Sequence, residues 1–169
     1  MVVFGIDPGS VATGYAAVHR KAGRYILLEA GVIRTRVKEP IPMRLLTIHT
    51  GLTEALARLK PDEVAIEAIF RHRSSESALR LGQARGVALL AVAQYGLDAT
   101  PYNPMTVKKS VGGHGGAGKA EMVRIVSRLV GRTEPLPSDA ADATAIAITH
   151  LVNATFNARL EKARGVRPS

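Results

Sequence analysis

The sequence predicts an α/β fold in which helices flank a mixed five-stranded sheet. Short apolar segments separated by turn residues occupy residues 1–34, which is typical of an antiparallel meander. Later apolar segments alternate with segments of helical periodicity, which is typical of parallel strands joined by helices. The chain has 169 residues and is 46% hydrophobic, as expected for one globular domain with a buried core. We therefore expect residues 1–156 to form a single domain and the basic residues 157–169 to form a flexible tail.

The predicted meander consists of three apolar segments joined by tight turns. Pro8 and Gly9 end the first segment, and the sequence 21–23, Lys-Ala-Gly, is a short connection between the second and the third. The three strands are expected over residues 1–7, 13–20 and 24–34.

A helix and a fourth strand follow the meander. Residues 43–59 place leucine and isoleucine at steps of three and four residues, which predicts an amphipathic helix that ends at Lys60 and Pro61. The apolar segment 63–70 predicts the next strand. Because a helical crossover precedes it, we expect this strand to run parallel to the first one.

Three helices and one short strand complete the predicted fold. Ser74 or Ser75 can cap a long helix that runs to about Tyr95. Residues 96–102 predict a short fifth strand. The last two helices are expected over residues 119–130 and 138–156.

The charge of the chain indicates a polyanionic partner. Lysine and arginine number 23 against 14 acidic residues, which gives a formal net charge of +9. Nucleic acid is the most common partner of such a domain, although a soluble protein that is merely basic has the same composition. The absence of cysteine excludes disulfides and thiolate metal sites. No apolar run approaches the roughly 20 residues that span a bilayer, and no signal peptide is evident, so we expect a cytoplasmic protein without a membrane segment.

Four acidic residues stand in apolar surroundings. Asp7 lies at the carboxyl end of the first strand and Glu67 near the carboxyl end of the parallel strand, where ligands of such sheets gather. Asp139 and Asp142 lie three residues apart in the first turn of an alanine-rich helix. A turn, a solvated strand end or the helix dipole could each explain one of these acids. Together they predict an all-oxygen site for Mg²⁺ or Mn²⁺, in which two ions could act on a phosphodiester.

The sequence GGHGGAGKA at residues 112–120 has the spacing of a phosphate-binding loop. A nucleotide-binding loop of this type needs serine or threonine after the lysine, but Ala120 follows Lys119. It also needs a buried strand in front of it, whereas residues 103–111 are polar. The segment is therefore interpreted as a glycine-rich loop that leads into a helix beginning at Lys119, and His114 is expected to be exposed.

Four segments together resemble one family of nucleases. They are GIDPGS with TGYA (residues 5–10 and 13–16), AIEAIF (65–70), ALRLGQARGVAL (78–89) and PSDAADATAIAITH (137–150). The chain closely resembles the RuvC-type Holliday-junction resolvases, of ribonuclease-H-like fold, from Val2 to about His150. The segments LGQARG and DAADATAIAITH are specific to that family, whereas GIDPG also occurs in other ribonuclease-H-like proteins.

The resemblance implies a homodimeric endonuclease that resolves four-way DNA junctions in recombination and DNA repair. It implies Mg²⁺ as cofactor, two ions in each active site, with Mn²⁺ as the alternative. Its implied partners are junction DNA and the branch-migration proteins RuvA and RuvB. It implies that the metal-binding acids are Asp7, Glu67, Asp139 and Asp142, the same four that the residues themselves indicate.

The resemblance also implies which residues contact DNA. Lys108 and Lys119 match positions near the scissile phosphate, where a lysine can stabilise the transition state. Phe70 matches an aromatic residue that stacks on an unpaired base, although a core phenylalanine would give the same local pattern. Arg71, Arg73 and Lys109 are expected on the DNA-binding surface, although a solvated face would also explain the lysines.

Small residues recur on one stripe of the helix that follows Ser74. Ala78, Gly82 and Gly86 are four residues apart and permit a close approach of another element. The partner could be the protein's own sheet or a second copy of the chain, and the resemblance favours a dimer contact.

Three other functions are compatible with parts of the sequence. Another ribonuclease-H-like nuclease, such as one that processes ribosomal RNA precursors, would share Asp7, but LGQARG argues against it. An actin-like sugar kinase or ATPase also begins with Gly-Ile-Asp, but needs two copies of the fold, and 169 residues hold one. A non-catalytic junction-binding protein would not need all four acids.

Overall fold

The computed structural model describes residues 1–68, 74–112 and 118–163. Its centre is a five-stranded sheet of order β3-β2-β1-β4-β5. β1 pairs with β2, and β2 with β3, in antiparallel orientation, whereas β1–β4 and β4–β5 are parallel. The strands are β1 (Val2–Asp7), β2 (Ala12–Lys21), β3 (Arg24–Arg34), β4 (Glu63–Glu67) and β5 (Ala99–Tyr102). The predicted mixed sheet is confirmed, including the parallel pairing of its first and fourth strands.

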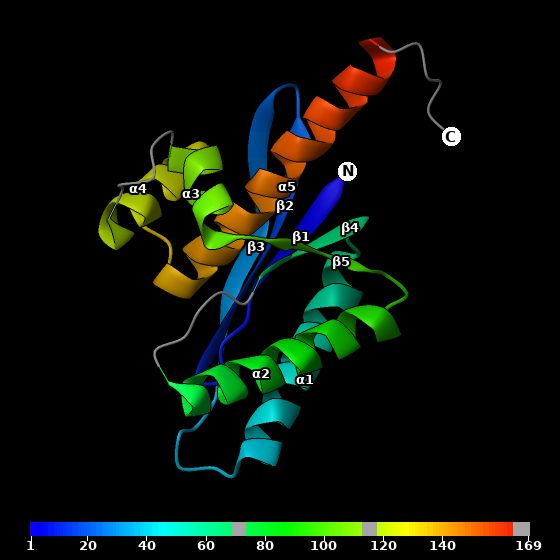
Figure 1. Ribbon diagram of the computed structural model, residues 1–169. Coiled ribbons are helices and arrows are strands. Elements are labelled where there is room, and N and C mark those ends of the chain that lie inside the picture. The colour runs from blue at the N-terminus through cyan, green and yellow to red at the C-terminus, as the bar shows by residue number, and fades with distance from the viewer. Residues whose placement is uncertain (69–73, 113–117, 164–169) are drawn as a thin grey trace.

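Helices cover both faces of this sheet (Figure 1). α1 and α2 pack on one face, and α5 lies across the other with α3 and α4 beside it. The helices are α1 (Ile41–Leu59), α2 (Ser75–Gln94), α3 (Pro104–Gly112), α4 (Lys119–Leu129) and α5 (Ser138–Ala163). Among the described residues, no helix combines the length and hydrophobicity that a membrane crossing needs.

The alternation of side chains along the strands divides the core into two clusters. Val3 of β1 faces the α3–α5 side, while its neighbour Phe4 faces α1 and α2. Both side chains are completely buried. On the second face, Ile48 and Leu52 of α1 contribute to the same cluster as Phe4, as the predicted amphipathic periodicity requires.

α5 rests directly on the backbone of the sheet because two strand positions are glycine. A Cβ atom added at Gly5 of β1 would lie 2.1 Å from the Ala143 carbonyl oxygen. One added at Gly14 of β2 would lie 2.0 Å from the Asp139 carbonyl oxygen. These approaches leave no room for a side chain, so they fix the start of α5 against the end of β1.

Four elements differ from their predicted extents by more than two residues. The fifth strand is shorter than predicted, since β5 begins at Ala99 instead of residue 96. The predicted strand 63–70 is shorter, since β4 ends at Glu67; residues 69 and 70 lie outside the described part. α3 was not predicted, because its segment is polar, yet Asn103 Oδ1 accepts a hydrogen bond from the Met105 backbone N–H at 2.8 Å and caps it. α5 continues to Ala163 instead of ending at 156, so the expected tail is helical up to that residue. The flexibility of residues 164–169, which lie beyond the described chain, stays a prediction.

Candidate active site

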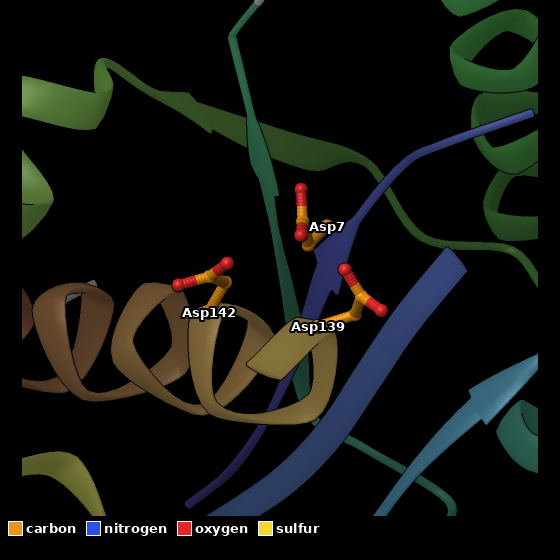
Figure 2. Close-up of side chains that lie close together, drawn as sticks. All are labelled: Asp7, Asp139 and Asp142. Atoms are coloured by element: carbon orange, nitrogen blue, oxygen red, sulfur yellow. The ribbon is translucent and has the colours of Figure 1, made fainter. Parts of the chain in front are cut away.

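Three aspartates from distant parts of the sequence meet at the carboxyl end of β1. Figure 2 shows Asp7 at the end of β1 beside Asp139 and Asp142 from the start of α5. Each can offer one carboxylate oxygen such that the three oxygens lie within 4.8 Å of one another. All three residues are half-buried, so the cluster is partly shielded from solvent and still accessible to it.

Local structure explains why these aspartates meet. Asp7 is paired with Gly14 across β1 and β2, and Gly14 is the position at which the backbone of Asp139 touches the sheet. α5 begins at Ser138, and the Ala141 backbone N–H donates to the Pro137 carbonyl at 2.8 Å. The three-residue spacing then directs Asp139 and Asp142 to neighbouring positions on the first turn.

Glu67 lies at the end of β4, the parallel neighbour of β1. Because Ile6 is paired with Ile66, Asp7 and Glu67 occupy corresponding positions at the same edge of the sheet. Glu67 and Asp142 line one pocket, so the fourth predicted acid faces the site as well. The group of three mutually close carboxylates comprises only the aspartates among the described residues.

The electrostatics of the site indicate an excess of negative charge, which its neighbouring lysines offset only in part. Burial, followed by the neighbouring carboxylates of Glu67, Asp142 and Asp139 in that order, raises the pKa of Asp7 to about 8, while Lys119 opposes the increase. Burial also raises the pKa of Asp142 above its usual range, against the effect of Lys119. Like charges in a partly desolvated site are stabilised by a cation. The clustered carboxylate oxygens are ligands that Mg²⁺ and Mn²⁺ accept, so these residues fit a divalent ion.

Two of the predicted lysines border this acidic pocket. Lys119 Nζ lies 3.6 Å from Asp142 Oδ2, and its side chain is 68% exposed. Lys108 lines the same pocket from α3, beside the buried Val107. Lys109 is exposed on α3 and is not among the residues that line this pocket. The pocket therefore combines carboxylates with exposed cationic side chains, the set of groups that can act on a phosphodiester.

The structure describes only some of the other residues that were predicted to contact DNA or a second protomer. Phe70, Arg71 and Arg73 lie outside the described residues, so their contacts with DNA stay predictions. Gly82 is half-buried and Gly86 exposed on α2, and a Cβ added at either would meet nothing within 4 Å. The alternative that these two glycines serve packing against the protein's own sheet is therefore wrong.

Sequence reasoning missed two features around the acids. The Arg85 Nε donates a hydrogen bond to the backbone carbonyl of Glu67 at 3.2 Å, which ties α2 to the end of β4. A groove also runs beside Asp139, between residues 9–12 and the residues Ser77 and Arg80 of α2. Arg85 lies within LGQARG, so the sequence signal for its role was a charged residue in a family-specific segment. No sequence signal indicated the groove.

Comparisons with known proteins agree with this arrangement. A family model described as crossover junction endodeoxyribonuclease RuvC matches residues 3–150. RuvC of Chloroflexus aggregans is 44% identical over 155 residues, which cover 91% of this chain and 94% of that protein. RuvC of Moorella thermoacetica is 42% identical over 166 residues, which cover 98% of this chain and 99% of that protein.

Solved structures give the same result. Thermus thermophilus RuvC in complex with a Holliday junction substrate superposes with a TM-score of 0.87 at 40% identity, covering 93% of this chain and 96% of that one. The yeast mitochondrial Holliday junction resolvase, with a TM-score of 0.63 at 16% identity, shares the fold; the alignment covers 87% of this chain and 76% of that one. On the matched residues 3–150, the chain belongs to the crossover junction endodeoxyribonuclease RuvC family.

Proposed function

We propose that this protein is a metal-dependent endonuclease that resolves four-way DNA junctions in recombination and DNA repair, in the cytoplasm. The observation that carries the proposal is the cluster of Asp7, Asp139 and Asp142, whose carboxylate oxygens lie within 4.8 Å of one another in a chain of the RuvC family. The net charge of +9 supports a nucleic-acid substrate.

We propose Mg²⁺ as the cofactor, two ions for each active site, with Mn²⁺ as the alternative. Asp7, Asp139 and Asp142 would hold them, with Glu67 contributing from the neighbouring strand. When bound, such ions would polarise the scissile phosphate and activate water at neutral pH. The oxygen-only donor set and the raised pKa values of Asp7 and Asp142 support this assignment.

The lysines at the pocket have a separate role in the proposed reaction. Lys119 and Lys108 would neutralise the charge of the phosphate as a water oxygen bonds to phosphorus and the bond to the 3′ oxygen breaks. The products would carry a 5′-phosphate and a 3′-hydroxyl. Because Lys119 is largely exposed and sits 3.6 Å from Asp142, it can turn from the carboxylate to an incoming phosphate without disturbing the core.

Resolution of a junction requires two nicks, and we propose that a homodimer supplies them. A two-fold dimer presents the same site twice, in the symmetry of a four-way junction. The exposed side of α2 supports an interface that includes Ala78, Gly82 and Gly86. Leu79 and Leu90 of the same helix are 63% and 51% exposed, and Gly86 lies between them on this face. Partners that drive branch migration, RuvA and RuvB in this family, would present the junction to the dimer.

A cleavage assay tests the proposal. A labelled synthetic four-way junction, the matching linear duplex and a structured RNA are incubated with the protein in Mg²⁺ or in EDTA. We expect cleavage of the junction alone, and only with the metal. Cleavage of the RNA in place of the junction would favour the ribosomal RNA-processing alternative, and binding without cleavage would favour a non-catalytic junction-binding protein.

A further inference from the structure

Arg44 is a buried cation that lies near the start of α1. Its side chain belongs to a residue that is 2% exposed, although arginine is rarely buried without an acidic partner. Within residues 1–68, 74–112 and 118–163, no acidic side chain forms an ion pair with it. Desolvating a guanidinium costs free energy that neutral acceptors recover only in part, so fold stability alone does not account for this residue.

The guanidinium contacts the loop between β1 and β2 and the end of β3. Its Nη2 donates to the Ser10 carbonyl at 2.5 Å, and its Nε donates to Thr35 Oγ1 at 3.2 Å. Thr35 in turn donates from its hydroxyl to the Ser10 carbonyl at 2.8 Å and from its backbone N–H to the Val11 carbonyl at 2.9 Å. Arg44 and Thr35 together form a clamp on the outer side of the loop.

A second anchor holds the loop from its other end. The hydroxyl of Thr13, which is fully buried, donates to the Gly9 carbonyl at 2.9 Å and accepts from the Gly9 backbone N–H at 3.3 Å. Each residue from Gly9 to Val11 therefore has a hydrogen-bonded anchor. The loop is therefore held at both ends, by Thr13 on one side and by Arg44 with Thr35 on the other.

This loop borders the active site in two ways. It begins immediately after Asp7, so its path sets where the end of β1 directs that carboxylate. Residues 9–12 also form one wall of the groove whose opposite wall includes Ser77 and Arg80, with Asp139 at its edge. A shift of the loop would therefore move the carboxylate of Asp7 and also the groove wall beside Asp139.

We propose that Arg44, acting through Ser10 and Thr35, is a positioning residue that holds Asp7 and the groove wall beside Asp139 in place for the reaction. The inference rests on the proposed function, because it assigns Arg44 to the geometry of that same site. Partners that orient metal-binding residues typically change metal affinity or activity by about 10–100-fold when they are removed. A displacement of about 1 Å at a reacting centre has effects of similar size.

The test compares variants of one helix. Arg44→Met keeps the aliphatic stem and removes the fork of donors, and Arg44→Lys keeps the charge with a different geometry. The matched control is Arg58→Met, which makes the same change on α1 at an exposed ion pair with Glu29. For each protein we would measure kcat and KM on a four-way junction, the Mn²⁺ concentration that gives the half-maximal thermal shift, and the melting temperature in EDTA.

We expect Arg44→Met to lower kcat by about 10–100-fold and to raise the Mn²⁺ midpoint several-fold, with Arg44→Lys between it and the wild type. KM for the junction should stay within about two-fold, because binding depends on the basic surface. The melting temperature should change by only a few degrees, since the Ser10 carbonyl keeps the Thr35 hydroxyl as a donor. Arg58→Met should match the wild type in all four measurements.

A folded Arg44→Met protein with the wild-type kcat and Mn²⁺ midpoint would overturn the inference. Should Arg44→Met not fold, Thr35→Val and Arg44→Lys decide the question, because both alter the clamp and keep part of it. Wild-type kcat and Mn²⁺ midpoint in both variants would equally refute it. If the wild-type protein itself leaves junctions intact, the proposed function fails, whereas the Mn²⁺ midpoints still report whether Arg44 orders the acidic site.

Discussion

Replacing Asp7 by asparagine should stabilise the metal-free protein at alkaline pH. Burial and three neighbouring carboxylates raise the pKa of Asp7 from 3.8 to about 8 in the folded state. Folding therefore favours the protonated carboxyl, and the unfolded chain releases that proton at much lower pH. Stability falls as pH rises from about 4 to about 8 and levels off above the folded-state pKa. Asparagine resembles the protonated carboxyl and cannot ionise, so the stability of the variant does not fall in this way as pH rises.

The size of the effect follows from the shift. A change from 3.8 to about 8 is roughly four pKa units, which at about 1.4 kcal/mol per unit sets an upper limit near 6 kcal/mol. The neighbouring carboxylates can share the proton with Asp7, which reduces the electrostatic repulsion in the wild-type protein. The difference between the variant and the wild type is therefore smaller than this limit. We expect Asp7→Asn to raise the free energy of unfolding by roughly 3 kcal/mol at pH 8.5, and by less than about 0.5 kcal/mol near pH 4.

Urea denaturation between pH 4 and pH 9, in EDTA, measures this difference. Asp98→Asn is the matched control, because Asp98 is exposed and lies outside the acidic pocket. Addition of Mg²⁺ should stabilise the wild type more than the variant, because only the wild type keeps the complete set of ligands. If Asp7→Asn were no more stable than the wild type at pH 8.5, or if its advantage did not grow between pH 4 and pH 8, the electrostatic account of the site would be wrong.

Other changes test separate parts of the structure. Asp142→Asn should reduce junction cleavage below detection in a gel assay, yet keep the junction affinity within a few-fold of the wild-type value. Binding of both proteins should weaken as salt rises. A variant that still nicks junctions at near the wild-type rate would contradict the metal site. Gly86→Leu should fold with an unchanged or higher melting temperature, since a Cβ there meets nothing within 4 Å. Light scattering should show that this variant is a monomer, and an intact dimer would place the interface elsewhere. His150→Phe should lower the free energy of unfolding by about 1–3 kcal/mol, because Tyr102 and Glu63 would lose their hydrogen bonds to the buried imidazole. An unchanged midpoint of urea denaturation would mean that these hydrogen bonds do not contribute to stability.

The sheet and the acidic edge could be predicted because they follow from local rules. A helical crossover makes β4 parallel to β1, and parallel strands end at the same edge, which brings Asp7 and Glu67 to corresponding positions. The three-residue spacing of Asp139 and Asp142 is likewise a local property of a helix. What no local rule gives is why α5 approaches that edge so closely: the contact depends on glycines of two different strands.

The features that sequence reasoning missed depend on tertiary context. The buried residues of α3 are Val107 and Val111, and their burial comes from packing against α4 and α5. The helix of residues 138–156 was expected to end early because the following segment is basic, yet no glycine or proline interrupts α5 before Ala163. A long side chain such as Arg44 can reach solvent or the interior from the same helical position, so its burial could not be read from the pattern.

The most direct test of the proposed function uses a supercoiled plasmid that extrudes a cruciform, which is a four-way junction within closed circular DNA. Two symmetric nicks across the junction convert the plasmid to a linear product with ligatable ends, whereas one nick gives a relaxed circle. In Mg²⁺ we expect linear product from the wild type, none in EDTA, and none from Asp142→Asn. Relaxed circles as the only product, or an uncut plasmid in both Mg²⁺ and Mn²⁺, would contradict the proposed function.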